Sequence, residues 1–574
     1  MSEKRWVYLD ENLDKNLISQ LAQEMHISTI LAKIMLNRGL TDKNQVEKFL
    51  AKSISGIHHP YNFKGMDIAV ERVVQAIQKK EKTVIYGDYD VDGITSTSIL
   101  YMFLKDLGAV VDYYIPDRID EGYGINIAAL DKICKNGVSL LITVDCGITA
   151  VNEVNYAKER GIDVIVTDHH TCKEQIPDAV AVINPKQPDC PYEFKDLAGV
   201  GVAFKFILAL AIRYGISTRE CFDKYVEFAA LGTIADVVPL RDENRIIVNS
   251  GLKIMQRNPS CGLDCLMHVA GLKEKPVNTT SVGYVISPRI NAAGRVGNAK
   301  VAVDLLTSTD RQHCYDTALT LNEENRMRQI KEQEIADEAL EIIKSHPKIA
   351  DNDVIVLYHE KWHHGIIGIV ASRISDIYHK PCIMLSLEDD IAKGSGRSVK
   401  GLNLFNALNY CSDLLIKFGG HELAAGLSIE QKNIDEFIKR INEYSKQNKT
   451  AEADFYTLEL DCELSPQSIT RKLIQNINAL EPFGTANPQP LFSMCNVVVQ
   501  NVRPIGINNK HLKLIVRKNN ITFSTVGFNL GHLAEKINVM SCIDIAFYPE
   551  INQYRNNDYI QLNIKDIVFP SENE

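Results

Sequence analysis

The sequence predicts an α/β protein in which two α/β lobes are joined by a long helix and followed by a C-terminal β-barrel. Short apolar β-like runs precede amphipathic helical runs between residues 66 and 170, and the same pattern returns between 352 and 445. From 455 to 570, short β-like segments alternate with polar turns, which is typical of a barrel. The chain has 574 residues, so we expect roughly three to five folded units.

The chain begins with a helical segment, residues 1–55, whose amphipathic patterns are NLISQLAQEM, ISTILAKIMLNRG and KNQVEKFLAK. We expect it to form a small cap or adaptor. The first lobe, 56–255, has predicted strands in KTVIYG, VVDYYIP, SLLITV and DVIVT, with helices in ITSTSILYMFLKDLG and ITAVNEVNYAKERG. Continuous apolar strands that alternate with helices predict a parallel sheet covered on both faces.

The connector, residues 256–345, overlaps a region, 197–330, that is mostly helical in pattern. It ends in the charged run LNEENRMRQIKEQEIADEALEIIKSH, which predicts a long helix leaving the first lobe. The second lobe, 346–448, has predicted strands in DVIVLYH and PCIMLSL, a helix in GIIGIVASRISDIY, and Gly-rich turns at 394–396 and 419–420.

The last part, residues 449–574, starts with the polar stretch that includes YSKQNKTAEADF. Its β-like segments are FYTLELDCEL, LFSMCNVVVQNVRPIG, HLKLIVRK, ITFSTVGF, IDIAFYPEI and YIQLNIKDIVF. Short strands of this kind predict a small barrel, with the OB-fold as the leading candidate.

Composition excludes several classes of protein. With 45% hydrophobic and 24% charged residues, the chain is outside the range of disordered proteins. No apolar stretch reaches 18 residues and the start lacks a signal-peptide core, so we expect neither membrane insertion nor secretion. The 13 cysteines are scattered without a CxxC pair, which favours reduced thiols in a cytoplasm. The net charge of −10 does not itself exclude nucleic acid, because local charge decides binding.

Acidic and histidine side chains follow three of the predicted strands of the first lobe. They are Asp88, Asp90 and Asp92 after KTVIYG, Asp145 after SLLITV, and Asp168, His169 and His170 after DVIVT. In open α/β sheets these strand ends face one crevice, where clustered carboxylates repel each other unless cations lie among them. Oxygen ligands with imidazole favour manganese or magnesium, with zinc as an alternative. Turn formation is the structural alternative for any one of these motifs.

Asp236 lies within the otherwise apolar run EFAALGTIADVVPL, where burial of an unpaired carboxylate would be costly. We expect a metal contact, with a helix cap or a salt bridge as the alternative. Two metal ions held by such a cluster would support hydrolysis of a phosphoester or phosphoanhydride. The sequence has neither GxGxxG nor GxxxxGK[ST], which argues against dinucleotide and P-loop sites.

Candidate phosphate-binding residues occur in both lobes. Arg118 follows a predicted strand, and SPRINAAGRVGN places Arg289, Asn291 and Arg295 in what we expect to be a Gly-rich turn. The second lobe contributes Ser395 and Arg397 in GSGRS and His421 in GGHELAAG. Each motif alone is equally compatible with a tight turn or a solvated side chain.

The predicted barrel carries local positive charge. Between Asn501 and Leu530 the basic residues are Arg503, Lys510, Lys513, Arg517 and Lys518, with no acidic residue among them. A basic β-barrel with aromatic residues is a typical platform for single-stranded nucleic acid. A solvated charged face is the alternative, and Phe523 and Phe528 could belong to the core.

The motifs GDYDVDG, ITVDCG, VTDHH and LGTIADVVPL resemble, in order and spacing, the four motifs of the DHH phosphoesterase superfamily. Within it, the chain from about residue 57 to its end is similar to the RecJ family of bacterial single-stranded-DNA exonucleases. The further motifs that carry this resemblance are HPYNFKGMDIAVERV, EGYG, SPRINAAGR, WHHGIIGIVASR, GSGRS, GGHELAAG and EPFGTANPQP. The resemblance implies a DHH domain, a DHH-associated domain and an OB-fold, with the active site in a channel between the first two.

The resemblance also implies roles for individual residues. By motif matching the metal ligands would be Asp90, Asp92, Asp145, His169 and Asp236, with Asp88 as an additional ligand. His170 would assist catalysis or contact the scissile phosphate. The DNA phosphates, including a 5′ end, would be held by Arg118, Arg295, Ser395 and Arg397, and His421 would lie beside the scissile region.

The chain departs from the family pattern at three positions. Tyr86 stands where many small-molecule members of the superfamily have His, which leaves the ligand set of the second metal open. His364 stands where the family usually has Pro, and Ala486 where it usually has Gly. We also expect no extra C-terminal interaction domain.

The resulting functional prediction is a 5′ to 3′ exonuclease that hydrolyses single-stranded DNA to 5′-mononucleotides in recombination and repair. Its cofactors would be two divalent ions, manganese or magnesium. Its partner would be single-stranded DNA, with a single-strand-binding protein and a helicase as candidates and no membrane. We expect a cytoplasmic monomer. The alternatives are a small-substrate DHH phosphatase and a non-catalytic binder of single-stranded DNA.

Overall fold

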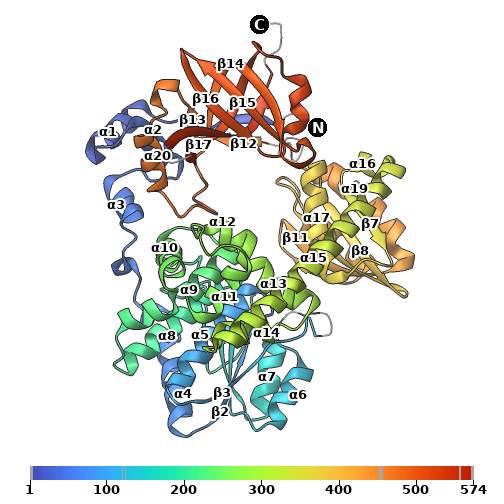
Figure 1. Cartoon of the computed structure of the whole chain (residues 1–574). Coiled ribbons are helices and arrows are strands. Elements are labelled where there is room, and N and C mark those ends of the chain that lie inside the picture. The colour runs from blue at the N-terminus through green and yellow to red at the C-terminus, as the bar shows by residue number, and fades with distance from the viewer. Residues whose placement is uncertain (1–3, 119–120, 123, 451–456, 555–556, 570–574) are drawn as a thin grey trace. The chain divides into compact units, whose positions relative to one another are not determined.

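The computed structural model of the chain describes residues 4–118, 121–122, 124–450, 457–554 and 557–569 (Figure 1). These residues form two compact units, one made of 57–238 and 246–450, the other of 4–56, 239–245 and 457–569. The polar stretch expected before the barrel lies partly outside the described residues, because 451–456 are not described. Among the helices that the structure describes, none has both the length and the apolar character needed to cross a membrane.

The first lobe is built on a five-stranded parallel sheet with the order β3-β2-β4-β5-β6. Its strands are β2 (Lys82–Tyr86), β3 (Val110–Tyr114), β4 (Leu140–Val144), β5 (Asp163–Thr167) and β6 (Ala181–Ile183). The four predicted strands are confirmed. The three-residue β6 was not predicted, because it is too short to show an apolar run.

Helices cover both faces of this sheet, as the continuous apolar strands require. On one face, α6 (Ile127–Lys135) and α7 (Val151–Glu159) pack on strand residues such as Val84, Leu141 and Val164. On the other face, α5 (Val91–Asp106) contacts β2 and β3, and α8 (Gly199–Arg213) contacts β4 and β5. The lobe also contains α4 (Met66–Gln78), α9 (Thr218–Ala235), α10 (Asp242–Arg257), α11 (Cys261–Val269), α12 (Thr279–Ser281) and α14 (Lys300–Thr307). The predicted helical character of the region after residue 197 is therefore confirmed.

The Gly-rich turn expected in SPRINAAGRVGN is wrong, because Ser287–Val296 forms helix α13, preceded by the π-helix η3 (Val282–Ile286). Gly294 lies inside this helix for a tertiary reason. A Cβ on Gly294 would lie 2.6 Å from the backbone oxygen of Tyr89, so only glycine lets α13 approach the loop after β2. Arg289, Asn291 and Arg295 are therefore side chains of a helix.

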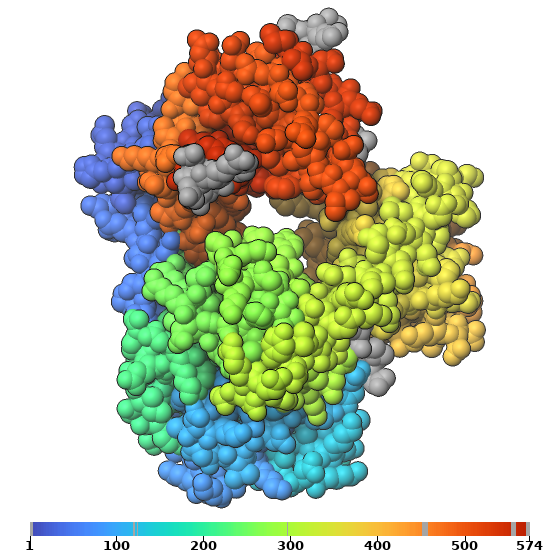
Figure 2. Space-filling view, in the orientation of Figure 1, coloured from blue at the N-terminus to red at the C-terminus, as the bar shows by residue number. Residues whose placement is uncertain are grey.

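The predicted long helix is α15 (Arg311–Ser345), with 35 residues, and Figure 2 shows it as an exposed yellow-green ridge. Its last turns supply Ile335, Ala336 and Ala339 to the core of the second lobe, where they join Ile366 and Val370 of α17 (His364–Tyr378). The connector is thus also a structural part of the second lobe.

The second lobe has a mixed sheet with the order β10-β11-β9-β8-β7, in which only β7 and β8 are parallel. The strands are β7 (Ile355–His359), β8 (Cys382–Glu388), β9 (Ile391–Arg397), β10 (Leu415–Gly420) and β11 (Ala424–Glu430); the helices besides α17 are α16 (Lys348–Asp351), α18 (Leu404–Tyr410) and α19 (Ile434–Asn448). The Gly-rich turns expected at 394–396 and 419–420 are wrong, because these glycines lie in β9 and β10. A Cβ on Gly394 would lie 2.4 Å from Leu385 Cδ2, so this glycine makes room for core side chains.

The C-terminal barrel is confirmed. Strands β14, β15, β16, β18 and β17 pair in that order, and a further pairing of β14 with β17 closes the barrel. Its elements are β12 (Thr457–Leu460), β13 (Cys462–Glu463), α20 (Arg471–Asn478), β14 (Phe492–Ile505), β15 (His511–Lys518), β16 (Ile521–Gly527), β17 (Cys542–Tyr554) and β18 (Asn557–Val568). The alternating burial along β15 gives one face to the core and one to solvent.

The N-terminal segment belongs to the same compact unit as the barrel. The predicted helices are confirmed as α1 (Lys15–Met25), α2 (Thr29–Asn37) and α3 (Lys43–Ala51), and their buried residues share one core with the barrel strands. The strand β1 (Arg5–Tyr8), which pairs in parallel with β12, was not predicted. Arg245 stabilises this unit, because its buried guanidinium donates to the carbonyls of Phe49, Leu480, Glu481 and Pro482.

Glu227 of α9 gives unit 1 a pH-dependent stability. The side chain is buried, and burial raises its pKa to about 7 although the Ser260 amide donates to both carboxylate oxygens, at 3.0 and 3.2 Å. The unfolded chain ionises Glu227 near pH 4.5, so stability falls as pH rises from 4.5 through 7, by about 3 kcal/mol at most. We expect Glu227→Gln to raise the unfolding temperature at pH 8 and to change it little at pH 5.

Thermal unfolding at both pH values measures this effect. Glu220→Gln, which changes an exposed residue of the same helix, is the matched control. A stabilisation by Glu227→Gln of equal size at pH 5 and pH 8 would contradict the assignment, because it could not come from ionisation of the buried carboxyl.

Candidate active site

Four of the candidate metal ligands follow strands at one edge of the parallel sheet. Asp88 and Asp90 follow β2, Asp145 follows β4 and His169 follows β5, so parallel strand geometry brings them together. Asp92 lies in the first turn of α5, and Asp236 ends α9 as its C-cap. The ligand atoms form three groups within 4.8 Å: Asp88, Asp90 and Asp145; Asp145, His169 and His170; and Asp92, His169 and Asp236. The structure therefore brings together all six predicted ligands and His170.

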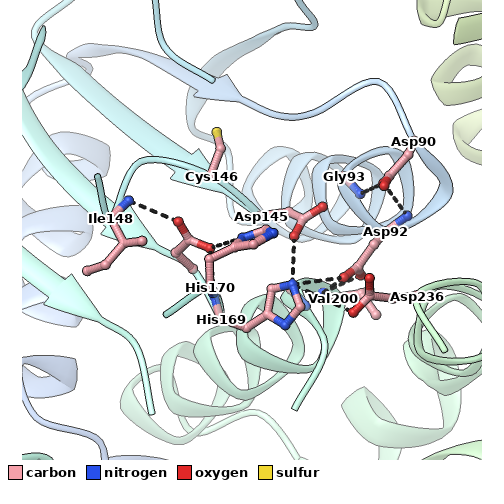
Figure 3. Close-up of polar contacts among 12 residues, drawn as sticks. Asp90, Asp92, Gly93, Asp145, Cys146, Ile148, His169, His170, Val200 and Asp236 are labelled. Atoms are coloured by element: carbon pink, nitrogen blue, oxygen red, sulfur yellow. Dashed lines mark hydrogen bonds and ion pairs between the residues drawn. The ribbon is translucent and has the colours of Figure 1, made fainter. Parts of the chain in front are cut away.

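His169 lies at the centre of this cluster, as Figure 3 shows. Its Nε2 is 3.2 Å from Asp145 Oδ1, 3.6 Å from Asp236 Oδ2 and 3.8 Å from Asp92 Oδ2. Burial, and then the charge of His170, lowers the pKa of His169 to about 3, so the imidazole is neutral, as a metal ligand must be.

The start of α8 holds two of the carboxylates in place. The amides of Gly199 and Val200 donate to Asp92 Oδ2 and Oδ1, each at 2.7 Å. A Cβ on Gly199 would lie 2.5 Å from Asp145 Oδ1, so a larger residue here would displace that carboxylate. Asp90 caps α5 by accepting from the amides of Asp92 and Gly93.

Among the described residues, the aspartates of the cluster outnumber the positive charges that act on them, which come from His170, Arg118 and Lys186. Burial, followed by the charges of neighbouring aspartates, raises the pKa of Asp88, Asp92 and Asp145 well above the usual value, and that of Asp236 to about 7. Asp88 Oδ1 and His169 Nε2 are buried without a hydrogen-bond partner among the described residues. Divalent cations would satisfy these atoms and restore the carboxylates, and an oxygen-rich set with one or two imidazoles suits manganese or magnesium. The residues present thus fit a divalent metal centre.

Asp168 orients His170, a role that the sequence prediction missed. Its carboxylate accepts from the amides of Ile148, His169 and His170 and lies 2.7 Å from His170 Nδ1. Burial opposes ionisation of both groups, but their mutual interaction lowers the pKa of Asp168 and raises that of His170. Their interaction therefore favours the ion pair of Asp168 and His170. The strand-end position of Asp168 was the only signal for this role in the sequence.

The arginine cluster consists of Arg118, Arg295, Arg328 and Arg397. Burial, and then the like charges of Arg118, Arg328 and Arg397, lower the pKa of Arg295 to about 9. Arg118 lies over the ring of Tyr89, 4.7 Å from its centre, and Tyr89 stands between Asp88 and Asp90. Four guanidiniums beside a metal centre form an anion-binding arrangement. Arg328 was missed, because it is hidden in the charged run of α15.

Three other candidates have different surroundings. Asn291 accepts from the amide of Val91 at 3.3 Å, and Arg289 donates to Asn322 and to the carbonyl of Val285, so both brace helices. His421 lies exposed between β10 and β11 and belongs to none of the three donor groups. Ser395 is 3.2 Å from Arg397 Nη1 and joins the arginine cluster.

Three family models match the chain. The DHH family N-terminal domain covers residues 82–233, the DHHA1 domain covers 351–447 and the RecJ OB domain covers 460–566. Five of the six candidate ligands lie within the match to the DHH domain, and Asp236 lies three residues beyond its end.

Curated proteins and solved structures are similar over most of the chain. The single-stranded-DNA-specific exonuclease RecJ of Bacillus subtilis is 40% identical over 98% of this chain and 71% of its own length. That of Haemophilus influenzae is 34% identical over 92% and 94%. The crystal structure of Thermus thermophilus RecJ with Mn²⁺ matches with a TM-score of 0.83 and 28% identity, covering 99% of this chain and 79% of that chain. A second structure of the Thermus protein contains Mg²⁺ and matches with a TM-score of 0.75 and 26% identity.

Proposed function

The chain belongs to the RecJ family of single-stranded-DNA-specific exonucleases, and from this premise we propose that it removes 5′-mononucleotides one at a time from the 5′ end of single-stranded DNA. It is a metal-dependent single-stranded-DNA exonuclease. The observation that carries the mechanism is the adjacency of two complementary sites: the buried carboxylate and histidine cluster, and the arginine cluster linked to it through Tyr89.

The metal ligands would be Asp88, Asp90, Asp92, Asp145, His169 and Asp236. Two bound divalent ions, manganese or magnesium as in the Thermus structures, would polarise the phosphodiester and activate the attacking water. His170, held by Asp168, would donate a hydrogen bond or a proton at the scissile phosphate. We propose that His421 approaches the same phosphate from the second lobe.

The arginine cluster would hold the 5′ end of the strand. Burial, and then the like charges of this cluster, lower the pKa of Arg295 and of Arg397, and a terminal phosphate dianion would offset this repulsion. Ser395 would add a hydroxyl donor, while Arg289 and Asn291 would contribute by holding α13 in place. A terminal phosphate fixed beside the metal centre would select the first phosphodiester and so set a 5′ to 3′ polarity.

The barrel would bind the strand further along. On its outer face, Arg503 of β14 stands directly opposite Lys513 of β15, and Arg517 is exposed on the same strand. Like charges opposite each other destabilise a sheet, and a phosphate chain would relieve this cost. Phe523 belongs to the core, whereas Phe528 is 52% exposed and remains available for stacking.

Digestion of a single-stranded oligonucleotide in the presence of Mn²⁺ tests this function. One sample carries its label at the 5′ end and the other at the 3′ end, and a matched duplex and a dinucleotide are digested in parallel. We expect early release of the 5′-terminal mononucleotide, stepwise shortening of the 3′-labelled strand and a spared duplex. Hydrolysis of the dinucleotide alone would instead identify a small-substrate phosphatase. The same proposal includes a role in recombination and repair. It places the protein in the cytoplasm as a monomer, with a single-strand-binding protein or a helicase as its protein partner.

A further inference from the structure

His364 is the first residue of α17 and lies where the first turn of this helix meets the arginine cluster. The side chain is half-buried, and its Nδ1 is buried without a hydrogen-bond partner among the described residues. The helix does not depend on this imidazole for its start, because the preceding His363 is the N-cap and accepts from the amide of Gly365. A buried ring nitrogen without a hydrogen-bond partner destabilises the fold, and a bound ligand would supply the missing hydrogen bond.

The phosphate-binding candidates meet this same turn. Arg295 Nη1 donates to the carbonyl of Gly365 at 2.9 Å. One turn later, a Cβ on Gly368 would lie 2.7 Å from Ser395 Oγ and 3.3 Å from Arg397 Nη2. Side chains from α13 and β9 therefore converge on residues 365–368, directly after His364.

Charged groups from three elements act on His364. Burial, and then the positive charges of Lys393 on β9 and of Arg118 after β3, lower the pKa of His364. The charge of Glu388 raises this pKa, and that of His363 lowers it. The imidazole is therefore neutral, and it can donate one N–H to an anion held by its cationic neighbours.

We propose that His364 is a phosphate-binding residue of the 5′-end site, where its imidazole N–H donates to an oxygen of the 5′-terminal phosphate beside Arg118 and Arg397. This inference rests on the proposed function, because it requires that the 5′ end is bound at the arginine cluster. A proline in place of His364 would start the helix but could not donate a hydrogen bond.

The test compares wild type with three variants on two 3′-labelled single strands that differ only in a 5′-phosphate or a 5′-hydroxyl. His364→Pro removes the imidazole and preserves the helix start, because the first amide of a helix has no intrahelical partner. His364→Gln keeps an N–H donor at similar reach. The matched control is His363→Asn, which keeps the cap and removes the neighbouring imidazole.

The measured quantity is kcat/KM on each strand and the ratio of the two. We expect His364→Pro to lower the preference for the 5′-phosphate roughly 10- to 100-fold, as for one hydrogen bond to a charged group. His364→Gln should restore most of it, and His363→Asn should leave it unchanged. An unchanged ratio in His364→Pro, or an equal loss on both strands, would overturn the inference while leaving the 5′ to 3′ activity in place. A wild type that does not digest from the 5′ end would overturn the proposed polarity and the inference together.

Discussion

Replacement of Asp145 by asparagine is expected to lower the rate of strand hydrolysis by about a thousandfold or more, because several kcal/mol of metal-dependent stabilisation would be lost. Asp145 is the one acidic residue that occurs in two of the donor groups, with Asp88 and Asp90 in one and with His169 and His170 in the other. Its loss would therefore weaken the binding of both metal ions. The arginine cluster would remain, so affinity for a 5′-phosphorylated strand should change by less than about threefold.

In the absence of metal, the same substitution should stabilise the fold. Burial, and then the charges of Asp92, Asp90, Asp236 and Asp88, raise the pKa of Asp145, so its ionised form destabilises the metal-free fold. We expect Asp145→Asn to unfold at a higher temperature than wild type in EDTA and to gain less stability from Mn²⁺.

Single-turnover hydrolysis, strand binding by fluorescence anisotropy and thermal unfolding with and without Mn²⁺ check these three expectations. Asp178→Asn is the matched control, because Asp178 is exposed and pairs only with Lys158 among the contacts described. Near-normal turnover by Asp145→Asn would contradict the assignment of Asp145 as a ligand of the metal centre.

Replacement of Asp168 by asparagine is expected to reduce kcat about 10- to 100-fold, as is usual for a residue that orients a group in the active site. The carboxylate accepts hydrogen bonds on both oxygens, from the Ile148 amide on Oδ2 and from His169 and His170 on Oδ1. An asparagine would place an NH₂ group against one of these donors. It would also remove the charge that raises the pKa of His170.

Because Asp168 does not contact the arginine cluster, KM for a 5′-phosphorylated strand should stay within about threefold. Steady-state kinetics on that strand, with Mn²⁺ titrations to separate a loss of metal affinity from a loss of rate, measure the effect. The exposed Asp178→Asn again serves as the control. Full kcat in Asp168→Asn would show that the position of His170 does not depend on this carboxylate.

The sequence predicted which acidic and histidine side chains come together, because the determinants of their positions are local. Each strand is an apolar run, each ligand follows a strand end, and parallel pairing brings those ends together regardless of sequence distance. Asp236 was identifiable because a carboxylate is anomalous in an apolar run. The role of Asp168 could not be predicted, since Asp, His and His in a row do not reveal which of them faces the metal and which faces the backbone.

The errors have tertiary causes. Gly394 and Gly294 were expected in turns, whereas they lie in a strand and a helix. Both positions require glycine because Leu385 and the Tyr89 backbone come too close for a Cβ. Arg328 has no motif, and only the packing of α15 places it beside Arg295. The four-residue strand β1 becomes a strand only by pairing with β12, about 450 residues further along the chain.

The shared core of the N-terminal helices and the barrel has a consequence for how the protein is made. Helices α1 and α2 are synthesised long before the barrel strands that bury their apolar residues, which begin about 450 residues later. At roughly 5 to 20 residues per second, Leu21, Ile34 and Met35 remain without these partners for at least about 20 to 90 seconds. During this interval the nascent chain exposes the apolar residues of these helices. The yield of correctly folded protein should therefore depend on translation speed and on chaperones that bind this segment.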